Sequence, residues 1–368
     1  MFKHIKISYH QFMVLVFFFT IGGAIIFIPS LTDSAKQDTW IGYIIGSGIG
    51  LLFVLLYNKL GSYFPNMTII EYSEKILGKW LGKTVSFLYF TYFFHCTAYF
   101  LRQLGDFINI YILTQTPIVA IYIIFFLIII MGVRIGLEPF ARASEIFYPL
   151  ILLLLFIFII FISPQIQFTN IQPILENINK LPVTIYYSLD SPYLQLVTFL
   201  MLFPFVIQFK KTKKSFILGT LIGSIFLSLI ILLSTLVLGV YHSSNLHYAT
   251  YILAQKINIG NIIQRIEVII ALIWLVALYF KTTIFFYAAN LSLAQILNLK
   301  DYRPLTFPLG ILSIIYAIVS VTNIASFKVY EANITTLHHL TFGLFFPLIL
   351  LIISKLKKTN KDLSKIKH

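Results

Sequence analysis

The chain has 368 residues, of which 59% are hydrophobic and 11% are charged, and its formal net charge is +14. A soluble domain carries about 25% charged residues, so this composition excludes a soluble globular protein and indicates that lipid surrounds most of the chain. The positive charge does not indicate nucleic-acid binding, because the basic residues lie between the apolar segments, where they set membrane topology.

The first apolar segment, residues 11–30, is weakened at its centre. Its sequence FFFTIGGAIIFIP contains the pair Gly22-Gly23 and closes with Pro29. Each glycine in a helix costs about 0.5–1 kcal/mol relative to alanine, so the pair gives no advantage to a helix that only crosses a bilayer. The segment follows a basic N-terminus, as in a signal peptide, but an apolar stretch of about 20 residues is too long for a signal core. We therefore expect a retained first span.

Further apolar segments follow along the chain, and a span requires about 20 apolar residues. We expect a single membrane domain, residues 1–368. Its ten expected spans are about 11–30, 41–58, 84–112, 117–133, 145–163, 183–209, 216–240, 262–287, 305–321 and 335–354.

The basic residues between these spans are distributed unevenly. Of the 27 Lys and Arg residues, twenty lie at the N-terminus, in the loops after the even-numbered spans and in the segment 355–368. Only four lie in the opposite loops: Lys36, Lys180, Lys256 and Lys328. Because an excess of Lys and Arg marks the cytoplasmic side, we predict two cytoplasmic termini and a basic cytoplasmic tail at 355–368.

Ten spans can form two sets of five, residues 11–163 and 183–354, and the second set must then run in the opposite direction. In transporters built from such inverted repeats, the first helix of each set is broken around a midplane site. The sixth span has a matching interruption, SLDSPYLQ at 188–195 followed by Pro204. We therefore predict an all-α integral membrane fold with broken first and sixth helices. The alternative for Gly22-Gly23 is a close-packing notch.

The second helix of each set carries glycines at four-residue spacing. Small residues at this spacing let two helices approach closely. They are Gly42, Gly46 and Gly50 in the second span, and Gly219 and Gly223 in the seventh. Both sets therefore share a second feature.

Ionisable residues inside spans are costly and mark function or structural pairing. Arg102 and Asp106 in the third span are four residues apart on one helix face, so they can pair, either as a structural ion pair or as an outer gate. Arg265 and Glu267 open the eighth span on the same side, as a solvated helix start or as part of that network.

Two further groups lie toward the cytoplasmic side. Arg142 and Glu145, at the start of the fifth span, are expected to pair and to fix an inner gate or loop. Lys281 lies about 19 residues into the eighth span. Its ammonium either snorkels to the interface or remains inside the protein as a fixed positive charge.

Several motifs, each weak alone, occur together in a specific order. ISYHQF and IGGAIIFIP open the chain, and YFPNMTIIEYSEKILGKWLGK follows the second span. GLEPFARASEIFYP precedes the fifth span, SPYLQLVTFLMLFPFV forms the sixth, and RIEVIIALIWLVALYFK lies in the eighth. In these motifs the chain resembles the endospore germination permease family, the B subunits of nutrient germinant receptors, within the amino acid/polyamine/organocation transporter superfamily.

The resemblance implies a LeuT-like fold that binds a small nutrient, such as an amino acid, at the midplane between the first and sixth spans. It also implies companion A and C subunits in the spore inner membrane. The candidate ligand-binding residues are Gly22, Gly23, Ala24, Tyr99, Ser191, Pro192, Tyr193 and Gln195. An amino acid permease coupled to protons or sodium is the alternative, whereas the paired interruptions disfavour a scaffold without a ligand.

Two positions qualify this expectation. Many relatives have a glutamate at the position of Gln195, and because an amide does not titrate, its presence puts proton coupling in doubt. In some members of the wider superfamily a lysine occupies the place of a coupling cation, which is one interpretation of Lys281. The chain has one cysteine, Cys96, and no zinc, P-loop or hydrolase motif, so we predict no catalytic residue, cofactor or metal site.

Overall fold

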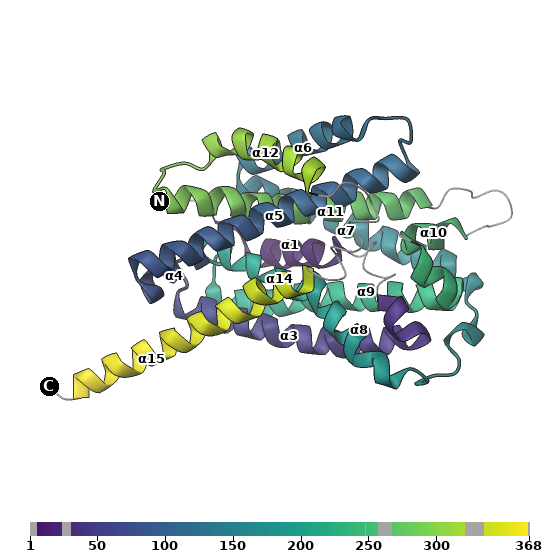
Figure 1. Cartoon of the computed structure of the whole chain (residues 1–368), viewed down its shortest axis with the longest axis horizontal. Helices are drawn as coiled ribbons and strands as arrows, with labels where there is room; N and C mark the ends of the chain where they lie inside the picture. Colours follow the sequence, from purple (N-terminus) through teal and green to yellow (C-terminus); the bar gives the residue numbers. More distant parts are fainter. Residues whose placement is uncertain (1–5, 24–30, 247, 257–266, 321–334, 367–368) are drawn as a thin grey trace.

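The computed structural model describes residues 6–23, 31–246, 248–256, 267–320 and 335–366. Over these residues the chain is helical, and its long helices run along the long axis of the molecule (Figure 1). In the described part, six helices are long and apolar enough to cross a membrane: Leu31–Tyr63, Ile118–Ile135, Leu137–Gln165, Lys211–Ser244, Glu267–Ile296 and Thr336–Lys357. Tyr9–Ile21 and Arg303–Val319 are shorter apolar helices.

Each of the ten expected spans overlaps helical residues. The first half of the chain contains α1 (Tyr9–Ile21), η1 (Lys36–Asp38), α3 (Thr39–Tyr63), α4 (Ile69–Leu77), α5 (Lys79–Tyr111), α6 (Ile118–Ile135), α7 (Leu137–Ile162), η2 (Ser163–Gln165), η3 (Phe168–Ile171) and η4 (Ile178–Lys180). The second half contains α8 (Leu181–Ser188), η5 (Leu189–Tyr193), η6 (Leu194–Met201), η7 (Phe203–Phe205), α9 (Phe209–Asn245), α10 (Ala249–Gln255), α11 (Glu267–Ile296), η8 (Arg303–Leu305), α12 (Thr306–Val319), α14 (Thr336–Leu340), η10 (Thr341–Phe345) and α15 (Phe346–Ile366).

Helix α1 is buried in the bundle and ends at the glycine pair. Ser8 caps its start, since the Ser8 hydroxyl accepts a hydrogen bond from the backbone N–H of Gln11 at 3.0 Å. Its apolar residues are buried on all sides, packed against α7, α9 and α11. Gly22 forms the C-cap and Gly23 lies in a turn, so the helix stops where the sequence places its weakest residues.

The sixth predicted span is interrupted at Ser191. Its first part is α8, followed by the π-helical turn η5 and the 3-10 helices η6 and η7. Ser191 has φ −128° and ψ 122°, which lie outside the helical region. Pro192 follows, and because proline lacks an N–H it cannot continue the hydrogen-bond ladder of the preceding turns. The change of helix type frees backbone groups near the middle of the molecule.

The glycines of α3 pack against α8 and η5. A Cβ added to Gly42 would lie 2.8 Å from Thr184 Cγ2, and one added to Gly50 would collide with the Tyr193 ring. The absence of a side chain therefore lets α3 approach the interrupted sixth span closely.

The glycines of α9 pack against α1 in the corresponding way. A Cβ at Gly219 would lie 2.5 Å from Met13 O, and one at Gly223 would lie 2.6 Å from Thr20 Cγ2. Thus the glycines of α3, which follows the first span, pack against the sixth span, and the glycines of α9, which follows the sixth span, pack against the first.

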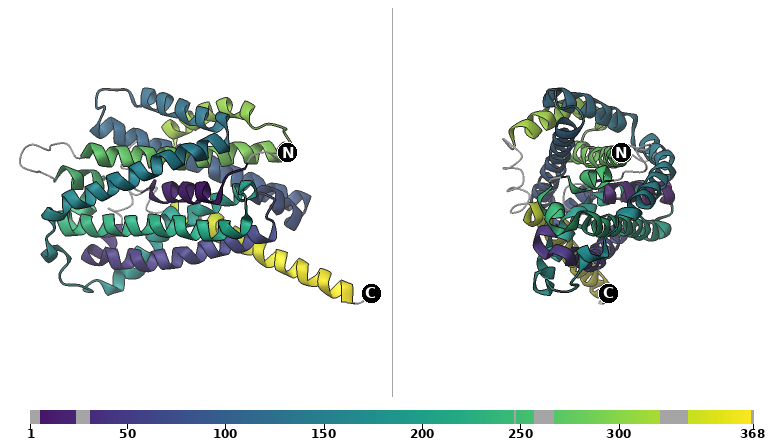
Figure 2. Two further views of the ribbon diagram at one scale, coloured as in Figure 1. Left: turned by 180° about the vertical axis from the view of Figure 1, so that it is seen from behind. Right: turned by 90° about the vertical axis from the view of Figure 1, so that its right-hand side faces the viewer.

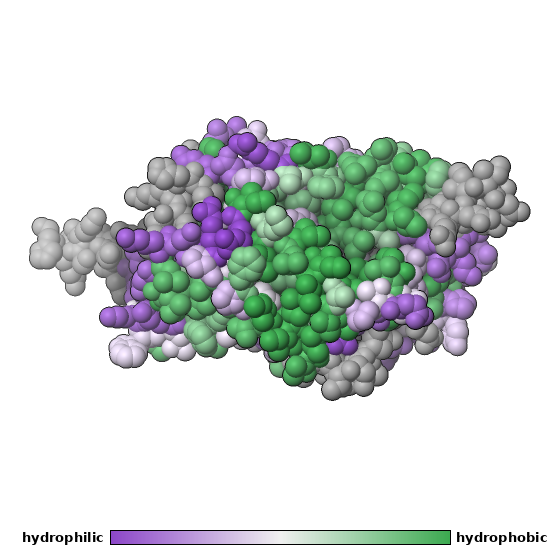
Figure 3. All heavy atoms as spheres, turned by 90° about the horizontal axis from the view of Figure 1, so that it is seen from above, coloured by the Kyte–Doolittle hydropathy of each residue, from purple (hydrophilic) through white to green (hydrophobic). Residues whose placement is uncertain are grey.

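The surface is apolar around the middle of the molecule. Figure 3 shows hydrophobic residues over the centre of one face and hydrophilic residues toward both ends. Large apolar side chains are exposed on the outer helices, including Leu52, Ile124, Met131 and Phe156. This belt is the surface that a bilayer covers. At one end α15 projects beyond the other helices (Figure 2).

Candidate functional site

Lys281 of α11 lies where α1 ends and the sixth span is interrupted. Its side chain is completely buried, at 0% exposure. The Nζ donates a hydrogen bond to Ser191 Oγ at 3.2 Å. A Cβ added to Gly23 would lie 3.1 Å from this Nζ and 2.8 Å from Ser191 Oγ. The ammonium therefore bridges the two interruptions, and only a glycine at position 23 leaves room for it.

Aromatic rings enclose the same ammonium. The ring centroids of Phe100 in α5 and Phe19 in α1 lie 4.4 and 5.0 Å from Lys281 Nζ, and such rings attract cations. Within the described ranges no carboxylate oxygen lies within 4.0 Å of this Nζ. Because the Lys281 side chain is completely buried, the interpretation that its ammonium snorkels to the membrane interface is wrong. A buried charge with no ion pair in direct contact is costly, so this ammonium is suited to an anionic ligand group.

A carboxylate lies next to Ser191 in the chain. Asp190 Oδ1 lies 2.5 Å from Nδ1 of His339 in α14, whose imidazole is buried. Gln195 Nε2 lies 3.4 Å from the same ring nitrogen, and Cys96 Sγ lies 3.7 Å from His339 Nε2. These side chains form a second polar cluster, which we call the Asp190 cluster.

The interruption thus carries an ammonium contact and a carboxylate on consecutive residues, Ser191 and Asp190. A small zwitterion such as an α-amino acid carries an ammonium and a carboxylate on the same carbon, and charge-assisted hydrogen bonds are the strongest kind available to it. The described residues contain no group of three or more His, Cys, Asp or Glu side chains that could hold a metal ion.

Other predicted ligand residues occupy different places. Tyr193 is buried, and its hydroxyl is hydrogen-bonded to Ser47 Oγ and Ser224 Oγ, each at 2.7 Å, so it joins helix η5 to α3 and α9. Pro192 is buried beside it. Tyr99 packs against His95 and Phe100, so Phe100, rather than Tyr99, contacts the Lys281 ammonium.

Gly22 packs α1 against α11. A Cβ there would lie 2.9 Å from Ala277 O and 3.0 Å from Lys281 Cβ. Ala24 lies outside the described residues.

The predicted ion pair of the third span is present. Arg102 Nε lies 2.9 Å from Asp106 Oδ2, and both side chains are buried. Arg102 also donates to Ala317 O of α12 at 3.3 Å, which ties α5 to a neighbouring helix. Arg265 lies outside the described residues, and Glu267 is partly exposed at the start of α11.

The predicted pairing of Arg142 with Glu145 is wrong. Arg142 Nη2 pairs instead with Glu138 Oε1 at 2.5 Å, one turn earlier in α7. Glu145 contacts His10 Nδ1 at 2.8 Å and accepts a hydrogen bond from Gln11 Nε2 at 3.0 Å. Glu145 therefore holds the first turn of α1 against α7, and its carboxylate is engaged there by His10 and Gln11.

Sequence reasoning missed four residues of the site: Phe19, Phe100, Asp190 and His339. The pair His338-His339 in an apolar span was a usable signal, since ionisable residues in spans are functional by default. No sequence signal distinguished Phe19 and Phe100 from the other phenylalanines, because the chain contains 36 phenylalanine residues.

Comparison with known sequences identifies a family. The family described as spore germination protein matches residues 6–325. Spore germination protein KB of Bacillus subtilis (strain 168) is 28% identical over 365 residues, which cover 98% of this chain and 97% of that protein. Spore germination protein YndE of the same organism is 27% identical over 365 residues, covering 97% of this chain and 98% of that protein.

Comparison with solved structures identifies the fold. The structure of MhsT in complex with L-phenylalanine matches with a TM-score of 0.65 at 13% identity, covering 95% of this chain and 98% of that chain. A manganese transporter of Eremococcus coleocola matches with a TM-score of 0.59 at 12% identity, covering 93% of this chain and 78% of that chain. The chain is therefore an integral multi-pass membrane protein whose fold is that of LeuT-like transporters. With the match over residues 6–325, it belongs to the spore germination protein family, which consists of receptors and transporters and not of enzymes.

Proposed function

We propose that the chain is the B subunit of a nutrient germinant receptor and binds a small amino acid at the two interruptions. The observation that carries this proposal is the buried Lys281 ammonium, which lies against Gly23, donates a hydrogen bond to Ser191 and has no carboxylate oxygen within 4.0 Å in the described part of the chain. The ligand carboxylate binds this ammonium, and the ligand ammonium binds Asp190. The second contact gives the Asp190 cluster a role in selecting zwitterions.

The proposed architecture is ten spans in two inverted sets, residues 11–163 and 183–354, with both termini in the cytoplasm. The exchanged glycine contacts of α3 and α9 support the repeat, and the excess of basic residues in alternate loops supports the orientation. The test is labelling of Lys211→Cys and Lys256→Cys variants with a membrane-impermeant thiol reagent. Reaction of Lys256→Cys alone from outside supports the topology, whereas reaction of both from one side contradicts it.

The proposed signal is a population shift. A ligand that binds one arrangement of the interruptions more tightly favours that arrangement by its difference in binding free energy. Companion A and C subunits in the spore inner membrane read the shift. Family membership supports this assignment, because the matched relatives are spore germination proteins.

The direct test is equilibrium binding to the purified chain. A panel of amino acids, and the same compounds lacking either charged group, would be measured against the wild type and Lys281→Met. Lys300→Met removes an exposed lysine and serves as the matched control. We expect Lys281→Met to lose affinity for every ligand with a carboxylate. Equal affinity in all three proteins would refute the site.

A second candidate function is amino acid transport, since transporters with inverted repeats bind their substrates at discontinuous helices like the two interrupted here. Proteoliposomes separate the two functions. Ligand accumulation driven by an imposed pH or sodium gradient, and lost in Lys281→Ala, would establish a permease. Binding without accumulation would establish a receptor.

A further inference from the structure

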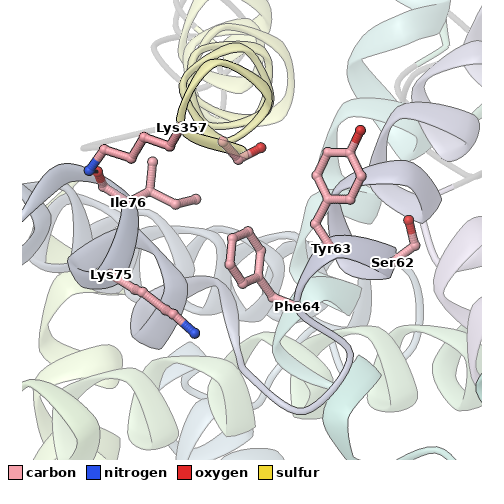
Figure 4. Close-up of a pocket in the computed structure, with 7 residues that line it drawn as sticks. Ser62, Tyr63, Phe64, Lys75, Ile76 and Lys357 are labelled. Carbon is pink, nitrogen blue, oxygen red and sulfur yellow. Dashed lines mark hydrogen bonds between the residues drawn. The ribbon is translucent and has the colours of Figure 1, made fainter. Parts of the chain in front are cut away.

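A pocket separate from the helix interruptions lies at the end of the bundle from which α15 projects. Its volume is about 510 Å³. The end of α3, helix α4 and α15 enclose it, and its lining residues are Ser62, Tyr63, Phe64, Lys75, Ile76, Ser354 and Lys357 (Figure 4). None of these residues takes part in the contacts around Lys281.

Two lysines give the pocket a positive charge. Lys357 Nζ of α15 donates to Ile76 O at 2.6 Å, and an ammonium has two further donors to offer. Lys75 Nζ of α4 lies 5.7 Å from the Phe64 ring centroid and 3.9 Å from Met67 Sδ. Over the residues described, neither ammonium has a carboxylate oxygen within 4.0 Å. The pocket therefore favours an anion.

Phe64 and Ile76 give the pocket an apolar wall, which lies beside the membrane surface. Phe64 stacks on Tyr72 with centroids 5.2 Å apart, and Figure 4 shows the Phe64 ring between Lys75 and Tyr63. Just beyond α4, Trp80 is 89% exposed at the start of α5. An exposed tryptophan near the end of an apolar helix marks the headgroup region of a bilayer.

We propose that this pocket binds the headgroup of an anionic phospholipid. The phosphodiester lies between Lys75 and Lys357, and the glycerol backbone rests on Phe64 and Ile76. Positive charge together with an apolar wall matches an anionic amphiphile, whereas a free phosphate ion makes no use of the apolar wall. Because one lysine comes from α4 and the other from α15, a bound lipid holds these two helices together.

The test compares lipid binding to three forms of the purified full chain: wild type, Lys75→Gln/Lys357→Gln, and the control Lys79→Gln/Lys83→Gln. The control removes two charges at the same end of the molecule but outside the pocket. Native mass spectrometry would count retained phosphatidylglycerol after extraction from vesicles that contain equal phosphatidylglycerol and phosphatidylcholine. We expect the pocket variant to retain at least about tenfold less phosphatidylglycerol, with wild type and control alike.

A thermal unfolding series keeps the proposal testable if the double variant is poorly folded. The single variant Lys75→Gln removes an ammonium that makes no hydrogen bond to the backbone of any described residue, so its stability in phosphatidylcholine should match the wild type. Phosphatidylglycerol should then raise the Tm of the wild type more than that of Lys75→Gln. Equal retention in all forms, or the same stabilisation of the wild type by inorganic phosphate alone, would overturn the proposal.

Discussion

Replacing Lys281 with methionine should stabilise the ligand-free protein and weaken ligand binding. The ammonium is fully buried, with one hydrogen bond to Ser191 and two aromatic neighbours. Methionine has a similar length and fills irregular spaces well, so it can occupy the same volume without a charge. If the ammonium serves ligand recognition, the substitution should raise stability and weaken binding. If it serves only stability, the substitution should lower stability and leave binding unchanged.

The magnitudes follow from these contacts. The lost hydrogen bond contributes about 0.5–1.5 kcal/mol, and each lost cation–ring contact about 0.5–2 kcal/mol. Against these stands a desolvation cost of several kcal/mol for a buried ammonium. The methionine sulfur regains about 0.3–1.5 kcal/mol at each of the two rings. The central values of these contributions leave a net gain in the free energy of unfolding of about 2 kcal/mol, within the range of about 1–4 kcal/mol found when a buried ion pair is replaced by apolar groups. Loss of the contact with the ligand carboxylate removes about 1.5–3 kcal/mol of binding, or roughly 10–150-fold in Kd.

Thermal unfolding in detergent, with and without ligand, measures both effects on one sample. Lys281→Met should have the higher Tm without ligand, and ligand should raise the Tm of the wild type more than that of Lys281→Met. The control Lys300→Met should behave as the wild type. A Lys281→Met protein that is less stable than the wild type yet binds ligand with unchanged Kd would show that the ammonium is only a structural link between α11 and Ser191.

Three further predictions concern the surroundings of this ammonium. Gly22→Leu should abolish the ligand response while the protein remains in the membrane, because a Cβ at this position would lie 2.9 Å from a backbone carbonyl of α11. Gly50→Leu, whose side chain would collide with Tyr193, should instead lower the amount of protein in the membrane on immunoblots. A normal response of Gly22→Leu would contradict the role of the interruption. Asp190→Asn should weaken amino acid binding about tenfold in equilibrium dialysis, while the affinity for the analogous carboxylic acid that lacks the amine should not change. An equal loss of affinity for both compounds would exclude a contact between Asp190 and the ligand ammonium. Gln195→Glu should shift preference toward cationic amines by about 1–3 kcal/mol in competition assays, and an unchanged ranking of ligands would argue against it.

Sequence patterns predicted features that depend on local chemistry. The glycine pair located the end of α1, and the SLDSPYLQ stretch located the non-helical Ser191. The four-residue spacing of Arg102 and Asp106 predicted their contact, because such spacing puts two side chains on one helix face. These features need no knowledge of how distant segments pack.

Contacts between distant segments were not predictable in the same way. Glu145 was expected to pair with Arg142, but its partner is His10, which lies 135 residues away in the chain. Asp190 and His339 are separated by 149 residues. Nothing in the spacing of either residue identifies the other, since only the packing of α14 against the interrupted span brings them together.

The exchanged glycine contacts also determine how this molecule can move. Where α9 meets α1, and where α3 meets α8, the glycines face backbone atoms or short side chains such as Thr20 and Thr184, so no long side chain lies there to reorient. A tilt of α9 therefore carries α1 with it, and a tilt of α3 carries α8. Helices can shift more easily where long side chains make the contact, as between Glu145 and His10. Ligand binding at the interruptions would therefore be transmitted as a rotation of one rigid group of helices relative to the helices around it.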